Sequence, residues 1–331
     1  MTDNAPARQL GTDTLGSFKY LEATVRPSLY RNGEVLTRRD PDGSDAGTQG
    51  VVLTPQEMVV HDARQRAAAR CTLEKNGFEL LHQPLSGPTV DFFDHAQVIN
   101  RYYADCVRVV EEFTGARAFA FDHNIRSAAG KQQQQRIRGG QQVQGPAHVV
   151  HGDYTLVSAP ARLQDLTRPP SGNDTLLGVL PAGESLISAA LAARACGPDG
   201  RFALINVWRN IAAEPVATHP LALCDGQSVM PEDLVVFEIH YPDRIGENYF
   251  ARYSPQHRWY YYPQMTGDEA LLIKQWDSAG ALAKSGGAQG DASAAGGPCT
   301  FSFHSAFVDP TTALDAPDRW SIEVRCLVLY R

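Results

Sequence analysis

The sequence predicts an α+β fold that is mainly β, with a jelly-roll or β-sandwich core and a supporting helical layer. Helical patterns dominate the chain before residue 116. The second half is a run of short segments that are rich in β-branched and aromatic residues and are separated by Pro, Gly and Asp. Helices followed by a block of strands are typical of a sheet core with helices packed on it.

Two helices are expected in the first half. One should begin at Thr54-Pro55 and end before Asn76-Gly77, because apolar residues between them recur at helical spacing. The other spans residues 95–115 and ends at a glycine. It carries one apolar stripe, made of Val98, Tyr102, Cys106, Val109 and Phe113. The strand-like segment 117–126 follows it.

The second half should contain at least seven strands and one helix. The helix is expected over residues 184–197, where alanine and leucine predominate. The strands alternate with turn residues along the rest of the chain. They are expected over residues 202–211, 220–229, 233–242, 258–265, 270–278, 299–310 and 319–330.

Four segments are expected to lie outside the core. Residues 1–16 should form a flexible N-terminal tail, residues 41–50 a turn-rich loop, and residues 278–298 a mobile surface loop. Residues 128–145 are rich in Gln and Gly with few apolar side chains, which predicts another mobile loop. That loop is either a solvated insertion or a lid over a site. Residues 17–331 are expected to form one domain.

Composition excludes several classes of protein. The 331 residues are 43% apolar and 20% charged, as in ordinary globular proteins. A net charge of −7 argues against nucleic acid as a partner. No apolar run is long enough to span a membrane, and the six cysteines are far apart with no C-x-x-C. We expect a cytoplasmic protein with reduced thiols; the oligomeric state cannot be read from the sequence.

The tripeptide His151-Gly152-Asp153 raises the question of a metal site. With ten histidines in the chain, one such His-x-Asp is about what chance produces, so it is not diagnostic alone. A second histidine, His304, lies in a later strand-like segment. Two imidazoles and one carboxylate on one side of an iron leave three positions free. His257, which follows a turn, is the rival to His304.

The last predicted strand carries an unusual polar face. Alternation places Arg319, Ser321, Glu323 and Arg325 on one side and apolar residues on the other. Arginines turned inward require a buried anion, and a guanidinium fits a carboxylate as a bidentate fork. Lys274, in another strand, is expected to be either a solvated charge, which we favour, or a second anion contact.

This order of His-x-Asp, distant His and Arg-x-Ser is similar to that of Fe(II)/2-oxoglutarate oxygenases. From about residue 50 to 331, the chain resembles the CmcJ/NvfI family of oxidoreductases, also described as gibberellin-desaturase-like and cephem-methoxylase-related. The phrases that carry the resemblance include "NGFELLHQPLSGPTVDFFD", "TGARAFAFDHNIR", "INVWRNI", "HRWYYYPQM", "FHSAFVDP" and "RWSIEVRCLVLY". The resemblance implies a double-stranded β-helix and oxidation of a small-molecule specialised metabolite with Fe(II), 2-oxoglutarate and O2.

On this resemblance, His151, Asp153 and His304 would hold the iron. Arg319 with Ser321 would bind the 2-oxoglutarate carboxylate, with Arg325 as the alternative. Substrate contacts are expected among Asn206, Arg209, Tyr261 and Arg138. The reaction would be hydroxylation, desaturation or a related oxidation. Two alternatives remain open: an iron jelly-roll enzyme that does not use 2-oxoglutarate, and a non-catalytic β-sandwich that binds a small anion.

Overall fold

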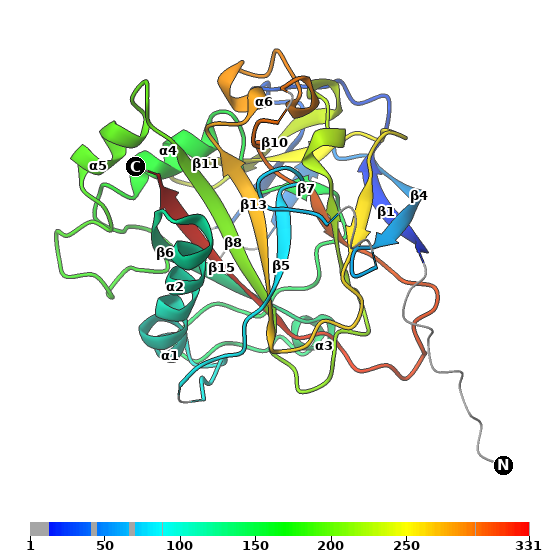
Figure 1. The fold of residues 1–331 in the computed structure, drawn as a ribbon, viewed down its shortest axis with the longest axis horizontal. Coiled ribbons are helices and arrows are strands. Elements are labelled where there is room, and N and C mark those ends of the chain that lie inside the picture. Colours follow the sequence, from blue (N-terminus) through cyan, green and yellow to red (C-terminus); the bar gives the residue numbers. More distant parts are fainter. Residues whose placement is uncertain (1–12, 41–44, 66–69, 88, 295, 331) are drawn as a thin grey trace.

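Two facing β-sheets enclose the core of the chain (Figure 1). The computed structural model describes residues 13–40, 45–65, 70–87, 89–294 and 296–330. The smaller sheet has five strands, and every neighbouring pair is antiparallel. In spatial order its strands are β5 (Phe78–His82), β13 (Glu269–Asp277), β8 (Phe202–Asn210), β15 (Ser321–Leu329) and β6 (Arg117–Arg126).

The larger sheet has ten strands and supplies the other wall of the core. Its pairs are antiparallel except for two parallel contacts, between β12 and β4 and between β10 and β2. In order, the strands are β1 (Thr14–Leu21), β4 (Leu53–Asp62), β12 (Trp259–Tyr261), β9 (Leu221–Cys224), β14 (His304–Ala306), β7 (His151–Gly152), β11 (Ile245–Ala251), β10 (Leu234–His240), β2 (Leu36–Arg39) and β3 (Asp45–Gln49).

One helical layer covers the outer face of the smaller sheet (Figure 1). It consists of α1 (His95–Gln97), a π-helical turn (Val98–Tyr102) and α2 (Tyr103–Thr114), which lies against β6 and β15. The helix predicted over residues 95–115 is therefore confirmed. Its apolar stripe is buried except for Phe113, and Gly115 ends it with a left-handed φ of 66°.

The remaining helices are short. They are α3 (Ala128–Gln132), α4 (Ser158–Asp165), α5 (Ala189–Ala195) and α6 (Ala281–Lys284), with 3₁₀ turns at Gly226–Ser228, Pro231–Asp233 and Asp291–Ser293. The predicted helix over residues 184–197 is confirmed as the shorter α5. Each strand predicted in the second half is present, the strand-like stretch around His151 contains β7, and the sequence missed β11 and the N-terminal strands.

The helix expected to begin at Thr54-Pro55 is wrong, because those residues lie in β4. Along this strand Met58, Val60 and Asp62 are buried while alternate neighbours are more exposed, which is a period of two. Of the apolar residues at helical spacing, Met58 is buried while the adjacent Val59 is 48% exposed. Pairing with β1 along its whole length decided the outcome, since two strands satisfy each other's backbone groups.

The boundary of the N-terminal tail also needs correction. Residues 1–12 lie outside the described residues, but β1 begins at Thr14 and buries alternate side chains from there. The turn-rich segment 41–50 contains β3, and its residues 41–44 are not described. Both predictions failed for the same reason: polar and glycine-rich residues can form strands when a neighbouring strand pairs with them.

The segment 128–145 has more structure than its composition suggested. It contains α3, whose N-terminus is capped by the Ser127 side chain, and it buries Ile137 and Val143. The backbone of Gln144 donates to the carbonyl of Ile125 at 2.9 Å, which ties the segment to β6. In the segment 278–298, α6 likewise buries Leu282. Both segments therefore contain ordered structure in spite of their composition. Whether they move on ligand binding stays a prediction.

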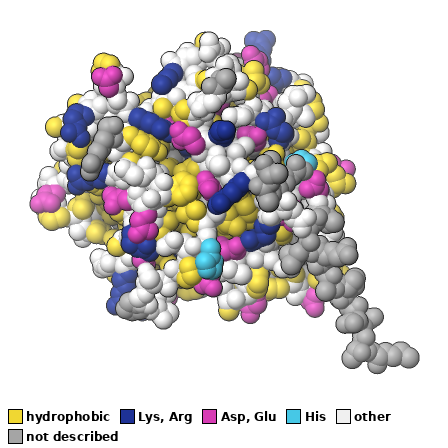
Figure 2. All heavy atoms as spheres, in the orientation of Figure 1, with side chains coloured by type: hydrophobic (Ala, Val, Ile, Leu, Met, Phe, Trp, Pro, Cys, Tyr) yellow, Lys and Arg dark blue, Asp and Glu magenta, His cyan; other side chains and the backbone are white. Residues whose placement is uncertain are grey.

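Figure 2 shows Lys and Arg side chains interspersed with Asp and Glu over the face in view, rather than gathered into a basic stripe. Within the described ranges, no helix combines the length and the apolar character that a membrane span requires.

The role of β1 in the fold can be tested by truncating Phe18. This side chain is fully buried and stacks on Trp259 with ring centroids 4.4 Å apart. We expect Phe18→Ala to lower the free energy of unfolding by about 3–5 kcal/mol, measured by chemical denaturation. Leu15→Ala, on the same strand but 53% exposed, is the control and should change it by about 0.5 kcal/mol or less. Equally small changes in the free energy of unfolding for both variants would indicate that β1 is not part of the stable core.

Candidate metal centre

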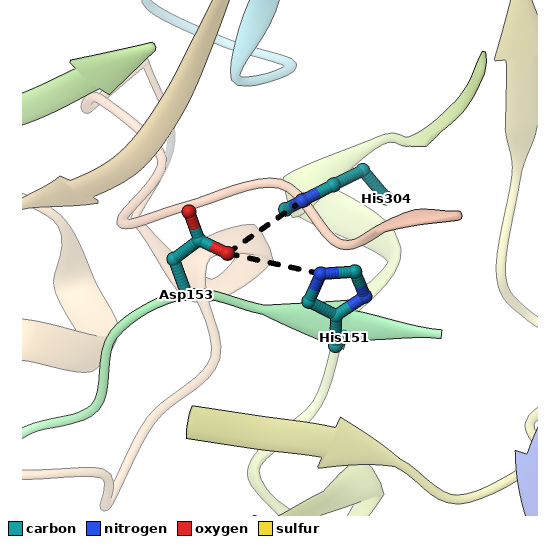
Figure 3. Close-up of side chains that lie close together, drawn as sticks. All are labelled: His151, Asp153 and His304. Carbon is teal, nitrogen blue, oxygen red and sulfur yellow. Dashed lines mark ion pairs between the residues drawn. The ribbon is translucent and has the colours of Figure 1, made fainter. Parts of the chain in front are cut away.

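Three side chains converge between the two sheets (Figure 3). His151 on β7 and His304 on β14 are direct partners across an antiparallel pair, so their side chains leave the same face. Asp153 follows two residues after His151 and therefore returns to that face. Asp153 Oδ1 lies 3.7 Å from Nε2 of His151 and 3.7 Å from Nε2 of His304. The sheet pairing, rather than sequence proximity, brings His304 into the cluster.

Neighbouring groups orient the three donor atoms. His151 Nδ1 donates to the carbonyl of Val149 at 2.8 Å, which leaves the lone pair on Nε2. Asp153 Oδ2 accepts from Asn206 Nδ2 at 3.2 Å and from Arg325 Nε at 3.3 Å, so Oδ1 faces the histidines. The two imidazole rings lie with centroids 4.3 Å apart and planes inclined by 51°. The contacts of His151 and Asp153 thus leave one free donor atom of each facing a common centre, while His304, whose Nδ1 has no partner among the described residues, is placed there by strand pairing.

The protonation states suit a divalent cation. Burial, reinforced by the neighbouring His304, lowers the pKa of His151 to about 4, so its imidazole is neutral at physiological pH. Burial alone would raise the pKa of Asp153, but Arg325 and the two histidines outweigh it and hold that pKa well below its usual range. A metal ligand must be deprotonated before it binds, and these two residues are already in that form.

The donor set fits a non-haem ferrous ion. Two imidazole nitrogens and one carboxylate oxygen on one face, with no fourth protein donor in this cluster of described residues, leave positions for other ligands. A structural zinc site would instead be closed by four protein ligands. All three residues are buried or half-buried, with their donor atoms within 4.8 Å of one another.

A small cavity opens beside the two histidines. Four of its nine lining residues are apolar, and the others are two histidines, two arginines and one glutamate. The lining residues are Arg126, Ala147, His151, Trp208, Leu221, His304, Ala306, Arg319 and Glu323. A second cavity, beside α4 and lined by four leucines among apolar and charged residues, contains none of the three converging residues. The cavity beside the histidines is therefore where a small molecule would meet a bound metal.

Arg319 and Ser321 present buried donors that have no protein partner. Arg319 is 2% exposed; one guanidinium NH donates to the carbonyl of His219, and its Nε has no partner among the described residues. The Ser321 hydroxyl is also without one in the described part of the chain. Burial and the nearby Arg126 lower the pKa of Arg319 to about 10, which still leaves it charged at neutral pH. Unpaired buried donors of this kind suit an anionic ligand.

Arg325 lies on the same face of β15 but is fully paired. Its three guanidinium nitrogens contact Asp153, Asp122 at 2.7 Å and Glu323 at 3.2 Å. Of the two arginine candidates, only Arg319 lines the cavity.

Of the four expected substrate contacts, only Asn206 reaches the cluster. Arg209 lies three residues further along β8 and so faces the other side, where its Nε donates to the Tyr102 hydroxyl at 3.2 Å. Tyr261 is 1% exposed and packs edge-on against Phe307. Arg138 is on the surface, paired with Asp91 at 2.7 Å. The structure therefore does not bring Arg209, Tyr261 or Arg138 to the cavity.

Two other sequence-based alternatives are resolved by their partners. His257 is a buried core histidine that contacts Asp233 at 3.1 Å and the Tyr20 hydroxyl at 3.0 Å. Lys274 is 1% exposed and lies 2.8 Å from Asp277, so the expectation of a solvated charge was wrong. Burial of a lysine requires a carboxylate partner, and Asp277 meets that requirement.

Arg126 and Asp122 are two further charged residues of the interior that were not predicted from the sequence. Both lie on β6, directly beside β15: Arg126 is the partner of Ser321 and Asp122 the partner of Arg325. A signal was present, because Asp122, Asn124 and Arg126 alternate with less polar residues as the polar face of β15 does. Two strands with matching polar faces could have been predicted to pair.

Comparisons with known proteins identify the family and relatives of this chain. A family model described as "Oxidoreductase/YMDC permease-like domain" matches residues 20–179 and 182–329. The chain is 44% identical over 193 residues to an uncharacterized protein in the dcmA 3′ region of Methylophilus leisingeri, covering 58% of the chain and 88% of the relative. It is 29% identical over 282 residues to the Fe(II)/2-oxoglutarate-dependent dioxygenase nvfI of Aspergillus novofumigatus, covering 83% and 84%.

A solved structure shares the fold. It is the iron and alpha-ketoglutarate-dependent endoperoxidase NvfI, which matches with a TM-score of 0.67 and 24% identity. The match covers 96% of this chain and 98% of that one. The likeness extends over the whole architecture, including both sheets.

Metal binding by the three residues can be tested directly. We expect His151→Ala, Asp153→Asn and His304→Ala each to weaken binding of Fe(II) or Co(II) severely under anaerobic conditions, measured by equilibrium dialysis. With only three protein ligands, the loss of any one removes a third of the bonds between protein and metal. His61→Ala is the control, since His61 is near the surface and pairs with Asp13 at 2.8 Å. Unchanged metal affinity in the three variants would contradict a metal site here.

Proposed function

The chain belongs to the Oxidoreductase/YMDC permease-like family, and from that premise we propose that it is a non-haem Fe(II)/2-oxoglutarate-dependent oxygenase. Its substrate would be a small-molecule specialised metabolite, oxidised by hydrogen abstraction in a hydroxylation, desaturation or related reaction. The observation that carries the proposal is the convergence of His151, Asp153 and His304 beside the unpaired donors of Arg319. The proposal includes a double-stranded β-helix as the finer description of the two facing sheets.

The residues divide the work as follows. His151, Asp153 and His304 would hold Fe(II), and Arg319 with Ser321 would bind the far carboxylate of 2-oxoglutarate through charged and neutral hydrogen bonds. When bound, the iron supplies the activation of O2, coupled to loss of CO2 from 2-oxoglutarate, that oxidises the substrate. Trp208, Leu221 and Ala306 form an apolar wall of the cavity, which limits water around the reacting groups.

Arg319 also separates this proposal from its alternatives. An iron enzyme that does not use 2-oxoglutarate would leave the buried Nε of Arg319, which has no partner among the described residues, without a ligand. A sandwich that merely binds an anion would have no use for two neutral imidazoles and a carboxylate sharing one centre. Both features, the three converging residues and the donors of Arg319, have a role only if a metal and an anionic co-substrate bind together.

A cytoplasmic location is a further part of the proposal. It is supported by the cysteines, all six of which are described and free of disulfides. Five of them are buried, where burial raises the pKa of the thiols of Cys106 and Cys224 to about 12 and keeps them unreactive.

The segment 128–145 is proposed to act as a cover over the cavity. Its end leads into Ala147, which lines the cavity, and the carbonyl of Gly145 accepts from Arg126 at 3.1 Å, another lining residue. The segment is held to the core by the buried side chains of Ile137 and Val143 and by backbone hydrogen bonds from Arg138 to the carbonyl of Phe93 and from Gln144 to that of Ile125, each at 2.9 Å. Opening would break these contacts locally, which costs less than global unfolding.

The co-substrate role of Arg319 gives a quantitative prediction. At saturating iron, Arg319→Ala should raise the 2-oxoglutarate concentration needed for half-maximal turnover about ten- to a hundredfold, because it removes a charged hydrogen bond worth roughly 1.5–3 kcal/mol. Anaerobic titration of the Fe(II) protein with 2-oxoglutarate, followed by the visible charge-transfer band of the chelate, measures the same change. If Arg325→Ala shows this effect at saturating iron and Arg319→Ala does not, the assignment of the two arginines is reversed.

The cover is tested by the coupling between co-substrate and product. Shortening the segment between Lys131 and Gln144 should leave succinate formation running while product falls, since an open cavity admits water. A deletion of similar length in the segment 278–298 is the control and should keep the two in step. Unchanged coupling, with hydrogen exchange in residues 128–145 insensitive to substrate, would make the segment a solvated insertion.

A further inference from the structure

Asp153 presents its two carboxylate oxygens to different surroundings. Oδ1 faces the two histidines, at 3.7 Å from each Nε2. Oδ2 is turned away and accepts from Arg325 Nε and Asn206 Nδ2. The backbone NH of Asp153 donates to Gln275 Oε1 at 3.3 Å, which fixes the position of the main chain. The carboxylate is thus held so that one oxygen is offered to a metal.

Arg325 is itself held by carboxylates on both sides. Its NH1 donates to Asp122 Oδ2 at 2.7 Å, and its NH2 donates to Glu323 Oε1 at 3.2 Å. The carboxylate of Glu323 also lies 3.5 Å from Arg126, so it is shared by two arginines. Each nitrogen of the Arg325 guanidinium therefore has its own carboxylate partner. Three of the five N–H donors of Arg325 are thus engaged by carboxylates, and Arg325 is not among the residues that line the cavity.

The surrounding strands make this arrangement rigid. Arg325 and Asp122 are register partners on β15 and β6, and Arg325 and Asn206 are register partners on β15 and β8. The three side chains thus come from three adjacent strands of the smaller sheet. Asp153 comes from the larger sheet. The contact between Arg325 and Asp153 is consequently a bridge between the two sheets at the metal centre.

We propose that Arg325 is a positioning residue for the metal ligand Asp153: by binding Oδ2 together with Asn206, it keeps Asp153 a single-oxygen ligand. The inference rests on the proposed function, because it takes the three converging residues as a metal site. A planar guanidinium suits this task, since its donors are fixed in direction and less entropy is lost for each bond. Without it, only Asn206 would hold Oδ2, and the carboxylate could rotate.

The consequence is a loss of metal affinity when Arg325 is removed, because outer partners that orient metal ligands typically matter ten- to a hundredfold. We expect Arg325→Met to weaken Co(II) and Mn(II) binding by about that factor, measured anaerobically by titration calorimetry. Arg325→Lys should recover part of the affinity, since an ammonium can reach one carboxylate but lacks the fork. Asp122→Asn, which weakens the shortest anchor of Arg325, should give a smaller loss in the same direction.

The matched control is Arg201→Met. Arg201 also bridges two carboxylates, Asp277 at 2.6 Å and Glu74 at 2.9 Å, but it contacts none of the three metal-site residues. It should lower thermal stability and leave metal affinity as in the unmodified protein. This separates a general loss of buried ion pairs from the loss of a positioned ligand.

The outcomes are distinguishable. Metal affinity in Arg325→Met equal to that of the unmodified protein, or lowered no more than in Arg201→Met, overturns the positioning role. If Arg325→Met does not fold, Asp122→Asn decides, and an unchanged affinity there overturns it as well. A failure of the unmodified protein to bind Fe(II), or to form the 2-oxoglutarate chelate, would instead contradict the proposed function.

Discussion

The interior of this protein depends on charges that are neutralised between two sheets. Arg126 and Arg325 pair with three carboxylates, Asp122, Asp153 and Glu323, while Arg319 lines the cavity beside them with no ion pair among the described residues. Burial of any one of the paired charges alone would cost several kcal/mol, so each needs a partner of the opposite sign. Those partners come from β6, β15 and the turn after β7, and the register of these strands is therefore constrained by charge as well as by packing.

This constraint explains how short strands can hold an accurate site. β7 has only two residues and β14 three, so backbone pairing alone gives them little support. The histidines are placed by their direct pairing across β7 and β14, and Asp153 by its contacts to the opposite sheet. All three residues come from the larger sheet, and the contact from Arg325 on β15 ties Asp153 to the smaller sheet.

The sequence predicted the chemistry of the site better than its surroundings. Alternation placed Arg319, Ser321, Glu323 and Arg325 on one face, and this is how β15 lies. The same rule was not applied to β6, so Asp122 and Arg126 were missed. It was also not applied to Asn206 and Arg209, whose odd spacing along one strand puts their side chains on opposite faces. The error over Thr54-Pro55 has another origin. The apolar residues after it were interpreted as a helical pattern, and pairing with β1 is what makes this segment a strand. Partners that are remote in sequence decide such cases, and a single sequence does not reveal them.

The balance of charge also bears on how the ligands of the proposed oxygenase would depend on each other. The three arginines and three carboxylates cancel, so the interior is close to neutral before anything binds. A divalent metal adds two positive charges within reach of the already cationic Arg319, and 2-oxoglutarate adds two negative ones. Each therefore corrects the imbalance that the other creates in a site of low dielectric, where such terms are strong. By linkage, metal should raise the affinity for 2-oxoglutarate by the same factor as 2-oxoglutarate raises the affinity for metal. In the proposed oxygenase, Arg319 would contribute to this coupling by binding the anionic co-substrate. Arg325 would contribute by holding the carboxylate of Asp153 that binds the cation.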